Sequence, residues 1–363
     1  MCWFLQGGTG RLRAARRGSL AGSGSGVERD PSLVASLASS ERVLCAVQML
    51  RSPPGCQLLF RRLAPVHLCL FAAAHLGAQE ATQTDRPGKR PNIVFVFSDA
   101  HATNAIGAYG GRLAGLDPTP AIDRLASQGM LFRNSYCTNS ICGPSRAVIL
   151  TGKHSHLNGF TDNGRRFDPD QQTFPKLLQK AGYRTAIFGK WHLGSDPQGF
   201  DVWDVLPGQG SYYNPVLRTK DGRRKVEGYV TDIVTDLAID WLKGRVESGE
   251  DQPFMLMCQH KAPHRNWMPP PEHLDLYDDV VIPEPETLFD DYSTRASPAR
   301  YQEMEIDRHM TMVYDLFVPP TADWDPDSGK SLDRSGWKNL QKLKPDQLAR
   351  WNAAFDDENA AFQ

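Results

Sequence analysis

Three short apolar runs, rich in β-branched, aromatic or long aliphatic residues, alternate with helical patterns along the middle of the chain. They are NIVFVF at 92–97, YRTAIF at 183–188 and PFMLMC at 253–258. Their largely apolar character is typical of strands buried on both faces. Strands that alternate with helices predict an α/β fold, in which a mostly parallel central sheet carries helices on both faces.

The helical patterns between these runs have recognisable ends. Thr119 and Pro120 open one helix, because threonine favours the N-cap and proline the first turn, and Gly129 ends it. The pattern of apolar residues predicts further helical segments at 173–182, 231–243, about 298–313 and 345–355.

Polar residues follow each of the three predicted strands. They are Asp99 after the first strand, Lys190 and His192 after the second, and His264 after the third. Because the carboxyl ends of parallel strands meet at the same edge of a sheet, these side chains are expected to lie close together. The sequence therefore predicts a functional site at this edge.

The first 90 residues differ in charge from the remainder of the chain. They carry 12 lysines and arginines against 5 acidic residues, whereas the remainder carries 29 against 37. Residues 1–48, rich in glycine, serine and arginine, are expected to be a disordered leader upstream of the true start. Residues 49–78 have the basic start, apolar stretch and small-residue end of a secretory signal peptide.

This interpretation starts translation at Met49, with a linker at 79–90 and the working domain at 91–363. It predicts a secreted or periplasmic protein; the alternative is a disordered leader on a cytosolic protein. The apolar stretch is too short and too interrupted by histidine to cross a bilayer, so no membrane span is expected. The basic residues form no stripe interleaved with aromatic residues, so no nucleic-acid partner is expected.

Cys142, in the stretch NSICGPSRAVILTGKHSHLNG, is open to several interpretations: an inert thiol, a nucleophile, half of a disulfide, or the precursor of another group. Of seven cysteines only Cys137, Cys142 and Cys258 lie outside the first 78 residues, which is too few for a disulfide framework. The spacing from Cys142 to Arg146 is shorter than in a cysteine phosphatase. The following glycine and proline do not suit a papain-like nucleophile.

The stretch CGPSRAVILTGKHSH resembles the signature of the type I sulfatases of the alkaline phosphatase superfamily. Four further blocks, PNIVFVFSD, TPAIDRLASQGMLF, GKWHLG and HKAPHRNW, follow the order of that family over roughly residues 90–310. The stretches NSICGPSRAVILTGKHSHLNG and LPGQGSYYNP are most similar to bacterial N-acetylglucosamine-6-sulfatase-like glycan sulfatases. The resemblance implies a sulfatase whose substrate is a sulfated carbohydrate or another sulfate monoester.

The resemblance also implies a modified Cys142, which a formylglycine-generating maturation enzyme oxidises to formylglycine (3-oxoalanine). One hydroxyl of the hydrated aldehyde attacks the sulfur of the ester, and the other lets the aldehyde re-form as sulfate leaves. Pro144 suits the first turn of a helix, so residue 142 would lie at a helix end that attracts anions.

Further residues take roles by the same resemblance. Arg146 would hold the diol or the metal environment in register, Lys190 would bind the sulfate, and His192 would hold the diol. His264 would contact the ester and protonate the leaving oxygen. Lys153 is a candidate for the cationic wall of the substrate pocket, and Asn163 is a candidate substrate contact.

The implied metal is Ca²⁺, with Asp99 and the modified Cys142 among its ligands. The family usually has two adjacent aspartates after the first strand, but Ala100 follows Asp99 here. A second, downstream pair is not recognisable, since 162–164 (Asp-Asn-Gly) reads as a turn and 346–347 (Asp-Gln) opens a polar helix. Weak calcium affinity and a missing C-terminal part of the fold are therefore expected, from either a gene fragment or a degenerate enzyme.

Three functions follow from this pattern. The first is a sulfatase that removes sulfate from a sulfated glycan or aryl ester. The second is a non-catalytic, truncated relative that binds sulfated sugars. The third is a phosphonate or phosphodiester hydrolase with the same formylglycine motif.

Overall fold

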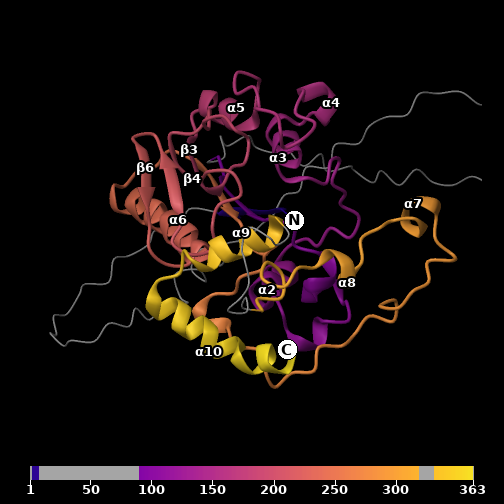
Figure 1. The fold of residues 1–363 in the computed structure, drawn as a ribbon. Coiled ribbons are helices and arrows are strands. Elements are labelled where there is room, and N and C mark those ends of the chain that lie inside the picture. The colour runs from indigo at the N-terminus through magenta and orange to yellow at the C-terminus, as the bar shows by residue number, and fades with distance from the viewer. Residues whose placement is uncertain (1, 8–89, 319–330, 363) are drawn as a thin grey trace, which may run out of the picture.

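The computed structural model describes residues 2–7, 90–318 and 331–362, which form a sheet flanked by helices (Figure 1). The sheet has seven strands in the order β1-β2-β7-β3-β4-β5-β6. Their bounds are Cys2–Gly7 (β1), Asn92–Ser98 (β2), Arg184–Lys190 (β3), Val202–Leu206 (β4), Val216–Thr219 (β5), Gly222–Lys225 (β6) and Phe254–His260 (β7).

The four central strands, β2, β7, β3 and β4, are parallel, whereas β1, β5 and β6 pair antiparallel at the two edges. The mostly parallel α/β sheet predicted from the apolar runs is therefore confirmed. β7 lies between β2 and β3, although it comes last in the chain. This order brings the ends of the three predicted strands side by side.

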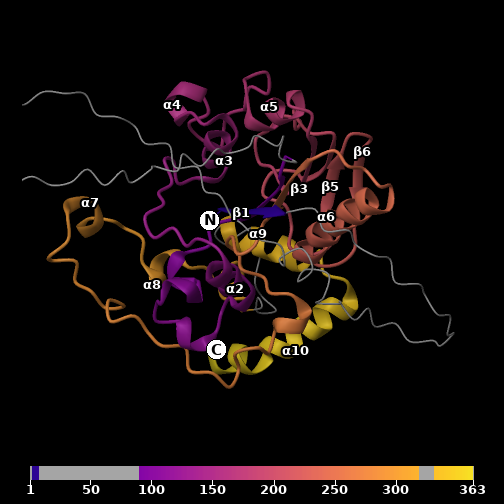
Figure 2. The ribbon, with the colours of Figure 1, turned by 180° about the vertical axis from the view of Figure 1, so that it is seen from behind.

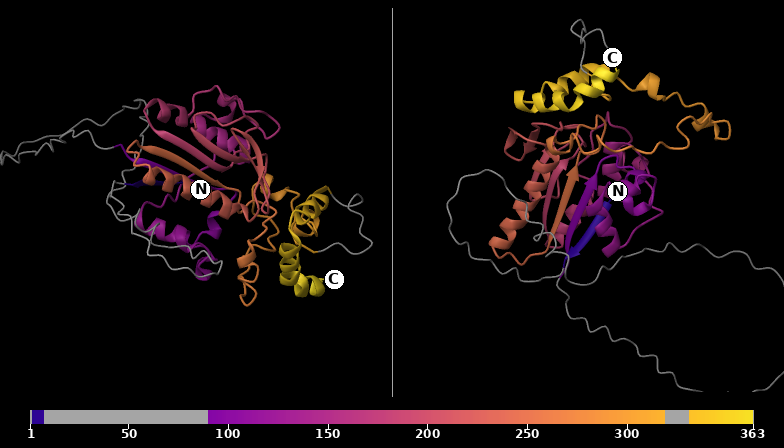
Figure 3. Two further views of the ribbon diagram at one scale, coloured as in Figure 1. Left: turned by 90° about the vertical axis from the view of Figure 1, so that its left-hand side faces the viewer. Right: turned by 90° about the horizontal axis from the view of Figure 1, so that it is seen from below.

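Helices cover both faces of the sheet (Figure 3). The side chains of β7 alternate between the two cores that these layers form. Met255 and Met257 face the core that contains α3 (Cys142–Thr151). Leu256 and Cys258 face the core that contains α6 (Val230–Glu247). An apolar strand buried on both sides requires this double layer, because each face would otherwise meet water.

The remaining helices are shorter or lie away from the sheet centre. Their bounds are Thr103–Ala105 (η1), Gly107–Tyr109 (η2), Ala114–Leu116 (η3), Pro120–Gln128 (α2), Ser155–Asn158 (α4), Phe174–Lys180 (α5), Pro271–His273 (η4), Ser297–Arg300 (α7), Ile306–His309 (α8), Ser331–Leu340 (α9) and Pro345–Phe362 (α10). Helices α9 and α10 lie across the carboxyl ends of the parallel strands (Figure 3, right).

The prediction of a helix at about 298–313 is wrong over most of that range. Only the short helices α7 and α8 form there, on a long loop (Figure 2). Between them Tyr301 and Met304 are 73% and 77% exposed. Without a buried apolar face a short helix is only marginally stable, because most helical stability in proteins comes from packing.

The leader is described only at β1, which pairs with β2. A strand here differs from the disorder expected for 1–48, because the unpaired edge of β2 offers backbone hydrogen bonds to any extended segment. The rest of that leader, the signal-peptide segment 49–78 and residues 79–89 of the linker lie outside the described residues. In the part of the chain that the structure describes, no helix combines the length and apolar character needed to cross a bilayer.

Candidate active site

The predicted site residues meet at the carboxyl edge of the sheet. Asp99 directly follows β2, and its backbone N–H donates to the carbonyl of Ala262 in the loop after β7, at 3.1 Å. Lys190 is the last residue of β3, and His264 lies in the same loop as Ala262. The strand order β2-β7-β3 thus brings together residues that are far apart in the sequence.

Helix α3 presents Cys142 to this edge, because the helix begins at Cys142. Gly143 allows the close approach: a Cβ there would lie 2.6 Å from a ring carbon of Phe160 and 2.9 Å from the carbonyl oxygen of His192. The backbone N–H of Gly143 donates to Oδ1 of Asn163, at 3.0 Å. The start of α3 is therefore fixed against the loop that carries His192.

Three polar side chains surround the Sγ atom of Cys142. Nζ of Lys190 and Nε2 of His264 each lie 3.7 Å from it, and the side chain of His192 also hydrogen-bonds to it. Burial alone would raise the pKa of Cys142, but the His192 hydrogen bond and the Lys190 charge lower it below its ordinary value. The site therefore stabilises negative charge at the end of side chain 142.

A buried cluster of charges lies beneath Cys142. Lys190 is fully buried and contacts the carboxylate of Asp99 and, at 2.5 Å, Oε1 of Gln209. Nη2 of Arg146 lies 3.6 Å from the same Asp99 oxygen. Burial would raise the pKa of Asp99, but Arg146 and Lys190 outweigh it and hold that pKa below its usual value. The two cations and one carboxylate leave a net positive charge.

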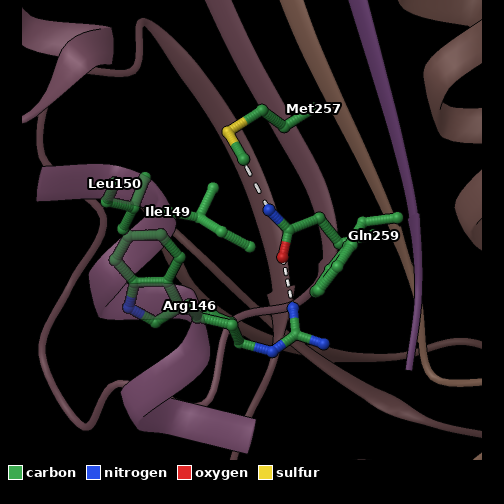
Figure 4. Close-up of a pocket in the computed structure, with 7 residues that line it drawn as sticks. Arg146, Ile149, Leu150, Met257 and Gln259 are labelled. Atoms are coloured by element: carbon green, nitrogen blue, oxygen red, sulfur yellow. Dashed lines mark hydrogen bonds between the residues drawn. The ribbon is translucent and has the colours of Figure 1, made fainter. Parts of the chain in front are cut away.

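Hydrogen bonds to residues of β3 and β7 fix the position of the Arg146 guanidinium. It donates to the carbonyl of Lys190 at 2.7 Å and to Oε1 of Gln259, while Met257 contacts the other end of that amide (Figure 4). Its guanidinium carbon also lies 5.0 Å from the centre of the Phe97 ring. The cavity in Figure 4 measures only about 10 Å³, so it is a packing gap and not a substrate pocket.

The imidazole of His264 has a defined tautomer. Its Nδ1 contacts the carbonyl oxygen of Arg265, which only accepts, so Nδ1 carries the proton. Burial and the Lys190 charge lower the pKa of His264 below 6.5, which keeps the ring neutral near pH 7. Its Nε2, directed at Cys142, is therefore a hydrogen-bond acceptor and a potential base.

The described residues do not form a calcium site. Asp99, Cys142 and His264 place one potential ligand atom each within 4.8 Å of one another. Ca²⁺ takes roughly 6–8 oxygen ligands, but Asp99 supplies the single carboxylate of this group and already pairs with Lys190. Position 100, where a second aspartate is typical of the resembled family, is an alanine.

The structure does not bring Lys153 to the cluster. Helix α3 spans 10 residues, which corresponds to about 15 Å along its axis, and Lys153 follows its far end. Oδ1 of Asn163 accepts a hydrogen bond from the N–H of Gly143, which is next to Cys142. In this structure Asn163 therefore positions the start of α3. The Asp162 side chain accepts from the N–H of Gly164 at 2.9 Å, as expected for a turn.

Gln209, Gln259 and Lys261 belong to the site region but were not predicted. A glutamine buried in an apolar strand, as Gln259 is in β7, needs a polar partner, and this signal was present in the sequence. Gln209 follows β4, a strand that the apolar runs did not reveal.

Comparison with known proteins gives consistent matches. The family model described as Sulfatase matches residues 91–313. The chain is 45% identical over 304 residues to N-acetylglucosamine-6-O-sulfatase from Bacteroides thetaiotaomicron, covering 82% of this chain and 52% of that protein. It is 35% identical over 215 residues to human N-acetylgalactosamine-6-sulfatase, covering 48% of this chain and 40% of that protein.

Among solved structures, that of BT4656 in complex with its substrate D-glucosamine-2-N,6-O-disulfate has a TM-score of 0.68 and 45% identity. The match covers 76% of this chain and 54% of that chain. The chain thus spans about half the length of the curated relatives it matches.

Proposed function

The chain belongs to the sulfatase family, and on this premise we propose that its site hydrolyses the 6-O-sulfate ester of a sulfated amino sugar. The observation that carries the proposal is the position of Cys142 at the start of α3, with Lys190, His192 and His264 around its Sγ atom. The 45% identical relative is named for 6-O-sulfated N-acetylglucosamine, which supports the substrate class.

The proposed active form carries formylglycine at position 142. The Sγ atom of Cys142 then stands in for the oxygens of the hydrated aldehyde, and the Lys190 and His192 donors suit such oxygens. When present, this group supplies one hydroxyl that takes up the sulfuryl group and a second that drives the release of sulfate. A serine at this position would supply the first hydroxyl alone.

The chain's own residues prepare the site for an anionic ester. Arg146 and Lys190 outnumber Asp99 in charge, and the positive end of α3 points to the same place. The ammonium group of Lys190 lies beside residue 142, where it can bind a sulfate oxygen and offset the charge that develops on it.

His264 is positioned to transfer a proton between residue 142 and the leaving sugar oxygen. Because its Nε2 is an unprotonated acceptor facing residue 142, it is suited first to take a proton from a hydroxyl there. Once protonated, the same nitrogen can give the proton to the leaving sugar oxygen. Because its ring is neutral, His264 acts first as a base. It can act as the acid that the resemblance implies only after it has taken up a proton.

The test uses protein produced together with a formylglycine-generating enzyme. The tryptic peptide with residue 142 should show the mass of the aldehyde, and the protein should release sulfate from glucosamine-6-O-sulfate. A Cys142→Ala variant should release none. An unmodified thiol in the active protein would overturn the mechanism, and preferred cleavage of a phosphodiester aryl ester would overturn the substrate.

Ala100 favours a second candidate function, a non-catalytic protein that binds sulfated sugars. With one carboxylate in the cluster, the described residues do not fit the calcium ion that the family generally uses. Formylglycine-containing protein that binds glucosamine-6-O-sulfate but never releases sulfate would support this candidate over the enzyme.

Export of the chain is also proposed, on the signal-peptide pattern at 49–78. Expression with and without residues 1–78, followed by measurement of protein in the medium or periplasm, tests it. Equal retention of both forms in the cytosol would contradict export.

A further inference from the structure

Gln209 is an exposed residue whose side chain contacts a fully buried one. Its Oε1 atom lies 2.5 Å from Nζ of Lys190, which is buried at the end of β3. Oε1 is the contacting atom, because an ammonium group only donates and the amide nitrogen of glutamine does not accept. An uncharged residue of the loop after β4 thus reaches the cation that lies beside Cys142.

A tight turn after β4 brings Gln209 to this position. Leu206, the last residue of β4, pairs with Lys190, the last residue of β3. The chain then turns, and the N–H of Gly210 donates at 3.1 Å to the carbonyl three residues earlier. Gly208 and Gly210, on either side of Gln209, have left-handed φ values of 55° and 71°, which glycine adopts readily. The turn therefore holds Gln209 close to the strand end that carries Lys190.

The ammonium group of Lys190 has three N–H bonds and three neighbours. It contacts Oδ2 of Asp99, Oε1 of Gln209 and, at 3.7 Å, Sγ of Cys142. Asp99 follows β2 and Gln209 follows β4, and these two strands lie on opposite sides of β3 in the sheet. The two oxygens therefore hold Nζ from two directions and leave its third N–H for residue 142.

The amide of Gln209 also suits the charge balance of the cluster. Asp99 attracts the ammonium of Lys190 strongly, because both are buried and water screens the pair little. Gln209 adds an acceptor on the other side without adding negative charge. A carboxylate there would cancel the excess positive charge that Arg146 and Lys190 hold over Asp99. An amide thus restrains the ammonium and keeps the site attractive to an anion.

We propose that Gln209 is a positioning residue, which fixes the ammonium of Lys190 against residue 142. Loss of its Oε1 atom lets Asp99 draw the ammonium away from residue 142. The effect on rate rests on the proposed function, because Lys190 acts there on the sulfuryl group. The effect on the side chain at 142 does not, since the same contact is present when that side chain is a thiol.

The first test measures the release of sulfate from glucosamine-6-O-sulfate by protein that carries formylglycine. Gln209→Met keeps the length of the side chain and removes its oxygen. It should lower kcat by about 10–100-fold with little change in KM, because a misplacement of about 1 Å is costly in the transition state. A role in folding alone would lower the melting temperature and leave kcat of the folded protein unchanged.

Gln209→Glu provides the matching rescue. It restores an oxygen acceptor for Lys190, so kcat should recover toward the original value. It also cancels the excess positive charge of the cluster, so KM for the anionic ester should rise several-fold. The two variants thus separate the position of the ammonium, which kcat reports, from the charge of the site, which KM reports.

The second test uses the unmodified thiol and needs no turnover. In a Cys137→Ser background, Cys142 is the single cysteine of the tryptic peptide 134–146, so mass spectrometry follows its alkylation by iodoacetamide. The rate depends on the thiolate, which a nearby ammonium stabilises. Gln209→Met should therefore slow the alkylation of Cys142 several-fold at neutral pH.

Gln198→Met is the matched control. Gln198 is also an exposed glutamine, in the loop after β3, and its amide donates to Asp170 at 3.2 Å. The control should change neither kcat nor the alkylation rate. Unchanged kcat in active Gln209→Met protein, or unchanged alkylation, overturns the positioning role. An original chain without turnover overturns the proposed function instead, and the alkylation rates then decide the role of Gln209.

Discussion

Gly143 sets how closely α3 approaches the His192 loop. An added methyl group would meet the Phe160 ring at 2.6 Å and the His192 carbonyl at 2.9 Å. Gly143→Ala should therefore lower the free energy of unfolding by about 1–3 kcal/mol, as overpacking does, and displace residue 142 from Lys190. Urea unfolding and sulfate release check the two effects.

A matched control is Gly244→Ala in α6, where an added Cβ meets nothing within 4 Å. There the change should stabilise the protein by about 0.5–1 kcal/mol, because alanine favours a helix interior over glycine. If Gly143→Ala behaves like the control, α3 does not depend on the close contact.

Ala100 adopts a left-handed conformation, with φ of 59°, which alanine disfavours and which aspartate and asparagine tolerate better. Ala100→Asp also restores a second carboxylate next to Asp99. The variant should therefore gain a calcium-dependent rise in melting temperature that the original chain lacks. Thermal unfolding with and without Ca²⁺ measures it.

Ala100→Asn is the control, because it relieves the same backbone conformation without adding charge. It should raise the melting temperature equally with and without calcium. A strong calcium dependence in the original chain would contradict our conclusion about the metal.

The protonation of His264 predicts the acid limb of the pH profile. Burial and Lys190 hold its pKa below 6.5, and the neutral ring is the active base. Activity should therefore persist down to that lowered pKa and fall as the ring becomes protonated at lower pH. His264→Gln should reduce the rate by about 10²–10⁴ and remove this limb. An unchanged limb in the variant would assign it to another group.

At the scale of elements, the sequence predicts the strands that are buried on both faces and misses those that are not. β2, β3 and β7 each contain a continuous apolar run, IVFVF, AIF and FMLMC respectively, so their pattern is distinctive. β6 is exposed throughout and reads GRRK, which carries no such signal. The sequence did not predict helix α9. Its apolar residues pack against segments that are far away in the sequence; Leu340, for example, lies in the same core cluster as Tyr212.

The sequence predicts the site residues that follow the ends of strands, but not the site residues that lie on more distant loops. Asp99, Lys190 and His264 follow apolar runs, and parallel pairing brings them together. Lys153 lies near Cys142 in the sequence, but the intervening helix separates them. Lys261 was not identified, since it lines a cavity whose other side comes from α9 and the turn after it.

The pair Arg265–Asp315 ties the loop after β7 to the segment before α9. Asp315 is buried and also accepts from the N–H of Thr311 at 2.8 Å. Asp315→Asn should therefore lower the free energy of unfolding by about 2 kcal/mol at neutral pH. Urea unfolding measures it, with Glu305→Gln, in an exposed pair with Arg308, as a control that should change little.

The pH dependence of this pair has a definite sign. Burial would raise the pKa of Asp315, but the hydrogen bonds from Arg265 lower it below 3.8. Its stabilisation is therefore present above pH 3.8 and is lost as the pH falls through the lowered pKa. The difference between the original chain and Asp315→Asn should shrink there; a constant difference would mean that the charge contributes nothing.

At the scale of the whole molecule, the site's attraction for anions does not come from net charge. The chain carries a net charge of −1. The positive field is local, produced by Arg146, Lys190 and Lys261, which are buried at one edge of the sheet. Such a local field steers anionic substrates even though the chain after residue 90 carries 29 lysines and arginines against 37 acidic residues.

The edge of the sheet at which β1 pairs with β2 leads to a further prediction. If export removes residues 1–78, β1 is lost and β2 becomes an edge strand whose unpaired N–H and C=O groups can pair with another chain. The chain from Gln79 should keep its site, because β2 still pairs with β7 from Ile93 to Ser98. It should also self-associate more than the full chain, as measured by light scattering over a concentration series. Equal association of the two chains would show that β1 does not protect this edge.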